Sequence, residues 1–401
     1  MVARRIALVP PRYGPDVVGG AEAVIRRVAH GLADRGWQVE VLTTCARDHY
    51  TWANVERAGE SVDRTDGGAT VTVRRFPIVL DTDGETRARV EAALAAGEVP
   101  TLAEQEAWMN DGPRVPELFH HLLDASDCYR AIVVSPYPFW TTFAAAGVAP
   151  ERTVLRPCLH DEPYARMELF EPVLTGSAGV WLQTGPELDL YQRVSVAPAQ
   201  TRIVGEGVDV PERYDPDGFR TRYELGRRPF VLYCGRREGA KGWEGLLGGF
   251  CDAVRKEDLD LTLVTFGVGE VHLPPDLPGR VIDLGFIDDR TRDDAMAAAS
   301  AYVQPSALES FSRTVMEAWL AGTPVIANGA GEVVRWHIER SGAGLTYDDP
   351  EELEQALRFV AEAPEAAAAL ARSGRDYVLE HYTWPGTLDR MEETLEEWFP
   401  Q

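Results

Sequence analysis

The chain has 401 residues, of which 45% are hydrophobic, and it carries a formal net charge of −24. This length is long for one hydrophobic core and suits two domains of ordinary size, and the apolar share excludes a wholly disordered chain. The net charge argues against non-specific binding to DNA or RNA, and it leaves at most a weak association with an anionic membrane surface.

Further classes are disfavoured by the distribution of residues. No apolar stretch is long enough to span a bilayer, and the N-terminal run 6–10 is too short for the core of a signal peptide. The five cysteines are odd in number and form no CxxC pair, so neither a disulfide framework nor a zinc site is expected. We therefore expect a cytoplasmic protein, and its oligomeric state stays open.

Predicted strands and helices alternate through the first half of the chain, a pattern typical of parallel sheets covered by helices. Strands are predicted at 6–9, 39–43, 71–75, 131–135, 153–156, 179–182 and 202–204, and helices at 21–35, 139–146 and 186–193. The segment 84–125 is predicted to be a largely helical insertion. Glycine, proline and charged residues then crowd into 205–229, where we expect a hinge at 207–213.

The alternation resumes in the second half. Strands are predicted at 230–234, 261–265, 281–284, 301–303 and 324–327, and helices at 243–254, 292–299, 313–321, 365–381 and 386–398. Asp349 and Pro350 give an N-cap and a first-turn proline, which predict one more helix that ends at 360. The sequence therefore predicts an α/β protein with two doubly wound units, which bind ligands where loops leave the C-terminal ends of strands.

A cationic loop follows the predicted strand 230–234. Arg236 and Lys241 flank this glycine-containing loop, and Lys241 is one of only two lysines in the chain. An anion such as a diphosphate would meet both cations and the free amides at the start of the next helix. For this motif alone, two surface cations beside a turn are an equally good interpretation.

A second loop carries two glutamates after the predicted strand 301–303. Glu309 lies just before the helix 313–321, and Glu317 lies inside it within an apolar run. The first carboxylate is placed to accept hydrogen bonds from sugar hydroxyls, and the second suits the paired hydroxyls of a ribose. Taken singly, each glutamate is more simply a surface charge near a helix start, but the apolar neighbours of Glu317 weigh against that interpretation.

Together these loops resemble the retaining GT-B glycosyltransferases of family GT4, the glycosyl transferases group 1. The chain reads GRxxxxKG at 235–242 and then PSxxExFxxxxxEAxxxGxPVIA at 305–327, whose two glutamates match the EX7E signature of that family. The segment 19–22 resembles its GGxE loop, and 284–287 resembles the loop whose backbone contacts the nucleotide base. The segment 204–209 resembles its NGVD hinge, with Glu206 where asparagine is usual. The resemblance extends over nearly the whole chain.

The resemblance implies a GT-B fold, in which two Rossmann-like domains face each other across a cleft. The acceptor-side domain would be 1–206, the domain that binds the nucleotide sugar would be 207–385, and the C-terminal helix 386–401 would pack back on the first domain. The implied reaction is retaining transfer from a UDP- or GDP-sugar to a hydroxyl acceptor in polysaccharide, glycolipid or secondary-metabolite biosynthesis. The base, the sugar, the acceptor and the linkage stay open.

Roles for individual residues follow from the matched positions. The donor would be bound by Arg236 and Lys241 at the diphosphate, Glu317 at the ribose, Phe286 and Ile287 at the base, and Glu309, Ser310, Phe311 and Ser312 at the sugar. Gly19 and Gly20 would let the backbone approach the phosphates. Since the family places a histidine against the donor sugar, His160, Asp161 and Glu309 are the predicted catalytic residues. Many relatives read E-G-F-G where this chain has E-S-F-S at 309–312.

An acceptor sugar could be stacked on aromatic rings of the first domain. Tyr137 and Trp140 follow the predicted strand 131–135, and Trp108 lies in the insertion. Aromatic residues at helical spacing are more often part of a core, so both interpretations stay open at this point.

Other functions fit the sequence less well than sugar transfer. An NAD-dependent enzyme is disfavoured, because no GxGxxG follows the first strand and the second strand ends in Thr43-Thr44 rather than an acid. A nucleotide-sugar epimerase and a catalytically silent nucleotide-binding subunit remain alternatives. Two Asp-x-Asp triplets, 81–83 and 258–260, lie away from the donor motifs. We therefore expect no resident cofactor and no requirement for a divalent metal.

Overall fold

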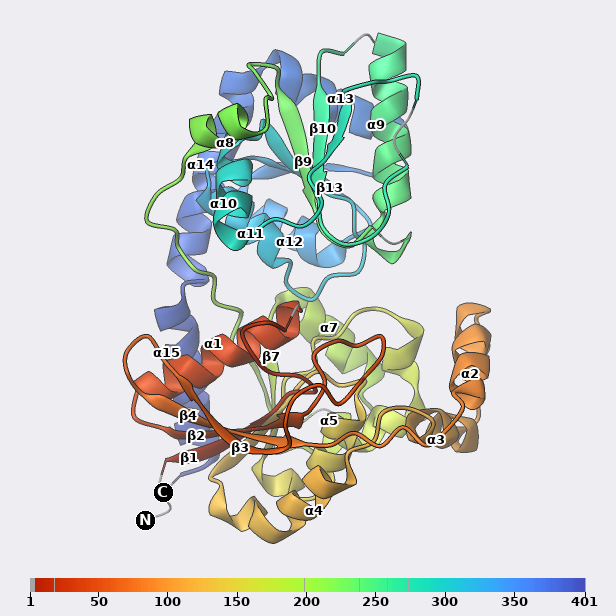
Figure 1. Cartoon of the computed structure of the whole chain (residues 1–401), viewed down its shortest axis with the longest axis vertical. Helices are drawn as coiled ribbons and strands as arrows, with labels where there is room; N and C mark the ends of the chain where they lie inside the picture. Colours follow the sequence, from red (N-terminus) through yellow and green to blue (C-terminus); the bar gives the residue numbers. More distant parts are fainter. Residues whose placement is uncertain are drawn as a thin grey trace. The chain divides into compact units, whose positions relative to one another are not determined.

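The computed structural model describes residues 4–17, 19–197, 199–237, 239–257, 259–272 and 275–400. The chain forms two compact α/β units, Met1–Gly205 with Trp384–Gln401, and Glu206–Thr383 (Figure 1). The expected boundaries, after 206 and before 386, lie beside these junctions. Asp258, part of the second Asp-x-Asp triplet, falls outside the described residues.

The first unit is built on one sheet with the strand order β3-β4-β2-β1-β5-β6-β7-β8. The strands are β1 (Arg5–Val9), β2 (Gln38–Thr44), β3 (Gly59–Arg64), β4 (Thr70–Phe76), β5 (Ala131–Val134), β6 (Thr153–Leu155), β7 (Gly179–Leu182) and β8 (Thr201–Ile203). All neighbours pair in parallel except β3 and β4, which are antiparallel. The seven predicted strands are confirmed, and β3 was not predicted.

Helices cover both faces of this sheet. They are α1 (Gly20–Asp34), α2 (Glu85–Ala95), α3 (Leu102–Asn110), α4 (Pro116–Ala125), α5 (Trp140–Ala146), α6 (Glu171–Gly176) and α7 (Gly185–Val194). Central strands such as β5 are buried along their whole length, as expected for parallel strands with helices on both sides. The predicted insertion forms α2, α3 and α4, and α2 projects from the unit on the right of Figure 1.

The C-terminal helix α15 (Trp384–Trp398) packs on the first unit beside α1 (Figure 1). Its Thr394 accepts a hydrogen bond from the Trp181 indole Nε1 at 2.8 Å, and the Phe399 carbonyl accepts one from Arg130 Nε at 2.7 Å. A Cβ on Gly31 of α1 would lie 2.3 Å from Leu388 Cδ1, so the two helices approach closely at this glycine and a larger residue would displace the Leu388 side chain. The predicted return of the C-terminal helix is confirmed.

The second unit contains a fully parallel sheet with the order β11-β10-β9-β12-β13-β14. Its strands are β9 (Phe230–Cys234), β10 (Thr262–Phe266), β11 (Val281–Asp283), β12 (Ala301–Gln304), β13 (Val325–Asn328) and β14 (Gly344–Tyr347). Its helices are α8 (Pro216–Arg222), α9 (Trp243–Glu257), α10 (Asp289–Ala298), α11 (Arg313–Leu320), α12 (Glu332–Ser341), α13 (Pro350–Glu362) and α14 (Pro364–His381). The elements α8, α12 and β14 were not predicted.

Each sheet has one place where the strand order reverses. In the first unit β1 is followed by β2 on one side and pairs with β5 on the other, and in the second unit β9 lies in the same way between β10 and β12. Loops that leave the C-terminal ends of such strands diverge, and this topological switch point is where open α/β sheets bind ligands. The predicted donor motifs follow β9 and β12.

Candidate functional site

The loops after β9 and β12 abut at the switch point of the second unit. Gly242 ends the first loop with φ of +72°. A Cβ at this position would lie 2.5 Å from the carbonyl oxygen of Pro305 in the second loop, closer than nonbonded atoms approach. Both the left-handed backbone and the tight contact require glycine. The GRxxxxKG and PSxxE motifs are therefore packed directly against each other.

Lys241 and Glu309 form an ion pair across these two loops. Lys241 Nζ donates to Glu309 Oε1 at 2.7 Å and to the Leu308 carbonyl at 3.4 Å. Both side chains are partly exposed, at 26% and 16%. The structure thus brings together the predicted diphosphate cation and the predicted sugar carboxylate. An anion that binds Lys241 here would compete with Glu309 for the same ammonium group.

The two consecutive arginines after β9 differ in their surroundings. Arg236 is exposed, and its carbonyl accepts a hydrogen bond from the Tyr233 hydroxyl at 2.6 Å. Arg237 is buried, donates to the carbonyls of Gly267 and Gly269 at 2.9 Å each, and pairs with Asp283. Arg237, which the sequence did not single out, therefore ties the loop after β9 to the ends of β10 and β11. Nothing in two adjacent arginines indicates which one turns inward.

The start of α11 carries the remaining predicted sugar contacts. Phe311 is buried, with its ring edge-to-face on His337 and Tyr382 at centroid distances of 5.4 and 5.0 Å. Ser312 is also buried and occupies the N-cap position in a left-handed conformation, but its hydroxyl makes no capping bond. Phe311 and Ser312 are thus packed into the second unit at the start of α11, and contact of their amides with a donor sugar stays a prediction.

Glu317 lies one turn into α11 within a cluster of charges. Its Oε1 is 3.4 Å from Arg292 Nη2 and 3.7 Å from Arg313 Nη2. Burial is the largest single influence on the pKa of Arg292 and lowers it, but Glu317 together with other nearby acidic groups, Asp289 and Asp293 among them, raises the pKa overall. Burial also raises the pKa of Asp293 to about 6. Glu317 therefore does not lie on a solvated face, and the two arginines beside it were missed by sequence reasoning.

The loop after β11 exposes a single aromatic ring. Phe286 is 73% exposed, directly after Gly285, whose φ is +65°. Gly285 N donates to Asp283 Oδ1 at 2.9 Å, and its carbonyl accepts from Gly267 N at 2.8 Å, which fixes the turn. Ile287 instead packs against the hydrophobic core. An exposed ring on a fixed turn offers a face on which a flat base can stack.

In the first unit, the loop after β1 contains a buried ion pair. Arg12 pairs with Glu22 of α1 and donates to the Arg47 carbonyl at 3.0 Å. A Cβ on Gly19 would lie 2.2 Å from Glu22 Oε2, so a larger residue there would displace the Glu22 side chain from its place beside Arg12. Gly20 has no atom within 4 Å of such a Cβ. The two glycines of the GGxE motif therefore differ: a side chain at position 19 would collide with Glu22, whereas a side chain at position 20 would meet open space.

His160 and Asp161 follow β6 but have different partners. His160 Nδ1 lies 3.9 Å from Glu162 Oε1, and that oxygen also accepts a hydrogen bond from the Tyr137 hydroxyl at 3.0 Å. Asp161 pairs with Arg166 and lies 3.7 Å from Arg193. The acid beside the histidine is thus Glu162, which the sequence analysis did not select.

The structure contradicts an acceptor-stacking role for Trp108 and Tyr137. Each is only 1% exposed and belongs to the hydrophobic core of the first unit. Both rings lie edge-on to Phe170, and the Arg87 guanidinium lies 4.6 Å from the Trp108 ring. Burial of these large rings stabilises the unit and leaves no free face for a sugar. Trp140 is only partly buried against the same core.

Known glycosyltransferases are similar to this chain in sequence and in fold. The model of the family "Glycosyl transferases group 1" matches residues 228–363, which contain both donor loops. A D-inositol 3-phosphate glycosyltransferase of Saccharomonospora viridis is 31% identical over 57% of this chain and 58% of its own length. A phosphatidyl-myo-inositol mannosyltransferase of Mycolicibacterium smegmatis is 26% identical over 95% of this chain and 90% of its own. Residues 228–363 belong to the group 1 glycosyltransferases, and the second relative extends the similarity over both units.

The predicted family, enzyme class and GT-B fold are therefore confirmed. The sucrose-phosphate synthase of Thermosynechococcus elongatus superposes with a TM-score of 0.72 at 20% identity, over 98% of this chain and 99% of its own. As a GT4 enzyme, the protein transfers a sugar from a nucleotide-sugar donor.

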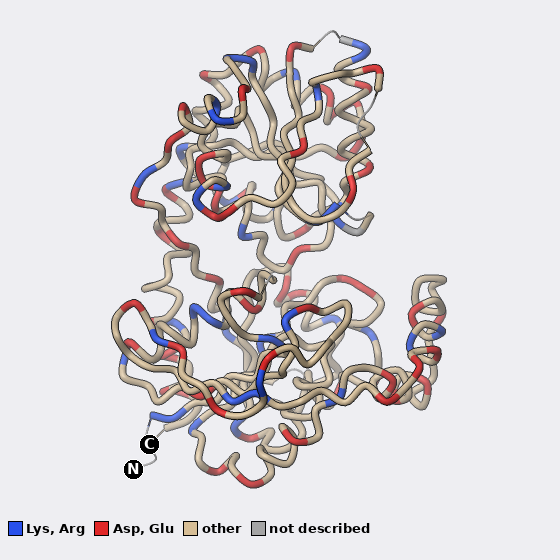
Figure 2. Tube along the Cα trace, in the orientation of Figure 1, with Lys and Arg blue, Asp and Glu red and all other residues tan. Residues whose placement is uncertain are grey.

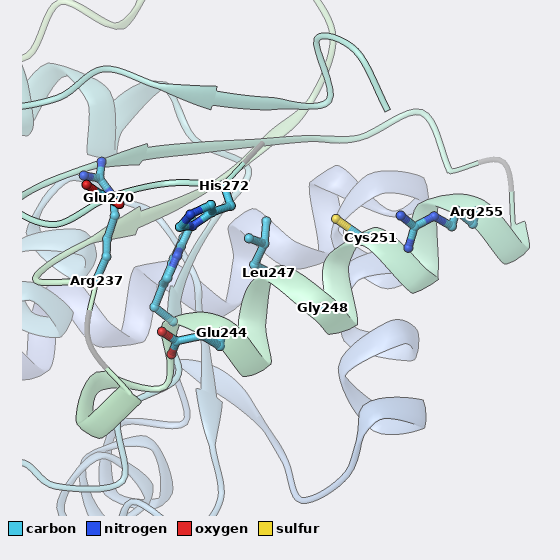
Figure 3. Close-up of a pocket in the computed structure, with 9 residues that line it drawn as sticks. Arg237, Glu244, Leu247, Gly248, Cys251, Arg255, Glu270 and His272 are labelled. Carbon is cyan, nitrogen blue, oxygen red and sulfur yellow. The ribbon is translucent and has the colours of Figure 1, made fainter. Parts of the chain in front are cut away.

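One cavity of the second unit lies outside the predicted donor site. It has a volume of about 490 Å³. Trp243, Glu244, Leu247, Gly248, Cys251 and Arg255 of α9 line it together with Arg237 and, from the segment after β10, Glu270 and His272 (Figure 3). Among the described residues, none of those predicted to bind the donor lines this cavity. It is on the β10 side of β9, whereas the donor loops meet on the β12 side.

The distribution of charged, apolar and metal-binding side chains bears on what this glycosyltransferase can bind. Figure 2 shows basic and acidic segments interleaved along both units. In the part of the chain that the structure describes, no helix is long and apolar enough to cross a membrane. Within the same residues, no cluster of three histidine, cysteine or acidic side chains is arranged to hold a metal ion.

Proposed function

We propose that this enzyme transfers a sugar, with retention of its anomeric configuration, from a UDP- or GDP-sugar to a hydroxyl acceptor. The donor would lie on the loops after β9 and β12. Arg236 and Lys241 would bind the diphosphate, Glu317 the ribose, and Phe286 with Ile287 the base. Glu309 and Ser310, with the backbone of Phe311 and Ser312, would bind the sugar.

The observation that carries this proposal is the 2.7 Å contact between Lys241 and Glu309. It joins an ammonium and a carboxylate on neighbouring loops of a switch point, so one small volume offers a cation to a phosphate and an acceptor to a sugar hydroxyl. Negative charge develops on the diphosphate as the bond to the sugar breaks. Fixed cations and amides that face this charge lower the barrier to transfer.

In this proposal, residues of the first unit also take part in the reaction. His160, held near Glu162, would stabilise positive charge on the donor sugar, with Asp161 beside it. Gly19 and Gly20 would let the backbone approach the phosphates. Of the aromatic residues proposed for the acceptor, only the partly buried Trp140 remains a candidate.

The acceptor class to test first follows from the named relatives. One acts on D-inositol 3-phosphate and the other on phosphatidyl-myo-inositol, so both names contain an inositol. We therefore propose a hydroxyl of a phosphorylated or lipid-linked polyol as the acceptor. A sugar hydroxyl in polysaccharide or secondary-metabolite synthesis is the next class.

We propose that transfer needs no divalent metal. Arg236 and Lys241 supply two positive charges, which offset most of what a divalent ion would contribute at the diphosphate. Asp81 of the remaining Asp-x-Asp triplet pairs with Arg114 in the first unit. Initial rates in excess EDTA should equal those with added magnesium or manganese, and a rate that collapses in EDTA and returns with metal would refute this proposal.

Product analysis tests the reaction itself. The purified chain should be incubated with UDP- and GDP-sugars and with inositol phosphates, and the anomeric configuration of the product read by NMR. Formation of a glycoside with the donor configuration supports the proposal. Conversion of the donor to a different sugar nucleotide without an acceptor would indicate an epimerase. Nucleotide binding with neither transfer nor donor hydrolysis would indicate a silent subunit.

A further inference from the structure

Ser312 has a backbone conformation that a side chain disfavours. Its φ is 68° and its ψ is 70°, in the left-handed region where a Cβ crowds the neighbouring carbonyl. It is buried and stands at the N-cap of α11, directly after the segment that contains Glu309. Since the conformation is intrinsically unfavourable, the surroundings must hold it.

Gln304, the last residue of β12, makes contacts at both ends of this segment. Its Nε2 donates to Ser312 Oγ at 2.8 Å, and its Oε1 accepts a hydrogen bond from Ser306 N at 3.3 Å. All three residues are buried, so these hydrogen bonds are costly to break. One side-chain amide therefore fixes the start and the end of the loop 305–312.

Neighbouring contacts extend the same arrangement. The Tyr302 hydroxyl on β12 donates to Thr314 Oγ1 at 2.9 Å, which anchors the first turn of α11. Asn328 Nδ2 donates to the Pro305 carbonyl at 3.1 Å but reaches only the first residue of the loop. Gln304 is thus the contact that joins β12 to the left-handed residue itself.

We propose that Gln304 is a positioning residue for the donor loop: it holds Ser312 in the left-handed conformation and thereby sets the position of Glu309. Glu309 lies between the two points that Gln304 fixes, three residues from each. Loss of the Gln304 bonds frees Ser312 to relax toward an ordinary φ, which moves the backbone that carries Glu309. The catalytic consequence rests on the proposed function of Glu309, whereas the structural consequence does not.

Hydrogen exchange measured by mass spectrometry tests the structural part. Gln304→Leu keeps the volume and removes the polar contacts with Ser306, Ser312 and, at 3.5 Å, Thr314, so amide exchange over 306–314 should rise by about tenfold. Glycine adopts a positive φ without support, so in the Ser312→Gly background the same change should raise exchange less than about threefold. Unchanged exchange in Gln304→Leu, or an equal rise in both backgrounds, would overturn the proposal.

Steady-state kinetics test the catalytic part. Gln304→Leu should lower kcat about tenfold while the affinity for UDP or GDP changes less than about threefold, because the displaced group acts on the sugar. Exchange that rises as predicted with an unchanged kcat would overturn the positioning role. If the wild-type chain neither binds these nucleotides nor transfers a sugar, the proposed function has failed, and the exchange experiment still decides whether Gln304 holds Ser312.

Gln105 provides a matched control. It is a buried glutamine of the first unit that also uses both ends of its amide, donating to the Pro100 carbonyl at 2.7 Å and accepting from Leu169 N at 2.9 Å. Gln105→Leu should lower the melting temperature but leave exchange over 306–314 unchanged. A rise there in Gln105→Leu would show that the readout reports general destabilisation and would remove the support for Gln304.

Discussion

The switch points of the two sheets each carry an ion pair between a basic residue and a glutamate, but the two pairs differ in solvent access. Arg12 and Glu22 in the first unit are 6% and 8% exposed, whereas Lys241 and Glu309 in the second are 26% and 16% exposed. Arg12 is further held by the Arg47 carbonyl. A pair sealed from water is part of the structure, while a partly exposed pair can exchange a partner for a ligand.

The same distinction separates the adjacent residues Arg236 and Arg237. Arg237 donates hydrogen bonds to two backbone carbonyls and pairs with Asp283, so it organises the loop after β9. Arg236, in contrast, is exposed to solvent. A position at a switch point therefore does not by itself make a charge functional. Solvent access is what distinguishes the exposed Arg236 from the buried Arg237 as a group that can meet a ligand.

The largest expected effect is on stability. Arg12→Met should lower the free energy of unfolding by about 3–5 kcal/mol, because it leaves the Glu22 carboxylate buried without its partner. Lys241→Met should cost less than about 1 kcal/mol, as expected for a partly exposed pair. Urea denaturation of both variants measures the difference. Equal losses of stability in the two variants would contradict the difference between the buried and the partly exposed ion pair. As a control, Glu22→Gln combined with Arg12→Met should recover part of the stability lost in Arg12→Met.

The next effect is on binding. Lys241→Met and Arg236→Met should each weaken UDP or GDP binding by about 1.5–3 kcal/mol, the range for a charge-assisted hydrogen bond, with little change for the free nucleoside. Calorimetric titration provides the affinities. Lys256→Met is the matched control, because Lys256 is an exposed lysine on α9 that pairs with Glu354 at 3.6 Å. Affinities equal to wild type in both test variants would remove the proposed anion site.

A smaller difference should separate the two glutamates of the EX7E motif. Glu317→Ala should weaken every nucleotide ligand by about 1–2 kcal/mol, because the ribose is common to all of them. Glu309→Ala should mainly lower the turnover of sugar transfer and change nucleotide affinity less than about threefold. Glu317→Gln controls for the loss of contact with Arg292. Equal effects of both alanine variants on plain nucleotide binding would contradict the assigned roles.

The smallest predicted effect concerns pH. The pKa of Asp293 is raised to about 6 by burial, so between its ordinary value and pH 6 the folded state binds more protons than the unfolded state. Stability is therefore lost as the pH rises through this window. Asp293→Asn should be more stable than wild type above pH 6 by about 1 kcal/mol, after allowance for solvent screening, and should lose this advantage near pH 4. A difference independent of pH would exclude this origin.

Much of the fold could be predicted because buried parallel strands correspond to short apolar runs in the sequence. Strands such as β9 and β12 are recognisable for this reason. The strand β3, Gly59–Arg64, was missed because it is an exposed antiparallel edge whose residues are mostly polar. The helix α8 buries only Phe219, although Asp215 before Pro216 gives the same start signal that correctly predicted α13.

The candidate site was predictable only in part. The motifs placed Lys241 and Glu309 on neighbouring loops, but their direct pairing depends on how closely the loops pack at Gly242. The sequence could not separate Arg236 from Arg237, since a change of one residue at a strand end turns a side chain inward or outward. Trp108 and Tyr137 were misassigned because aromatic residues suit a sugar and a hydrophobic core equally well.

The central claim is that the partly exposed switch point of the second unit binds the nucleotide sugar. The most direct measurement is the hydrogen-exchange footprint of saturating UDP and GDP on the wild-type chain in excess EDTA. We expect at least one nucleotide to slow exchange most strongly over 235–242 and 305–317, and we expect Lys241→Met to weaken this protection. Protection by neither nucleotide, or protection confined to the cavity residues of α9 and 270–272, would contradict it.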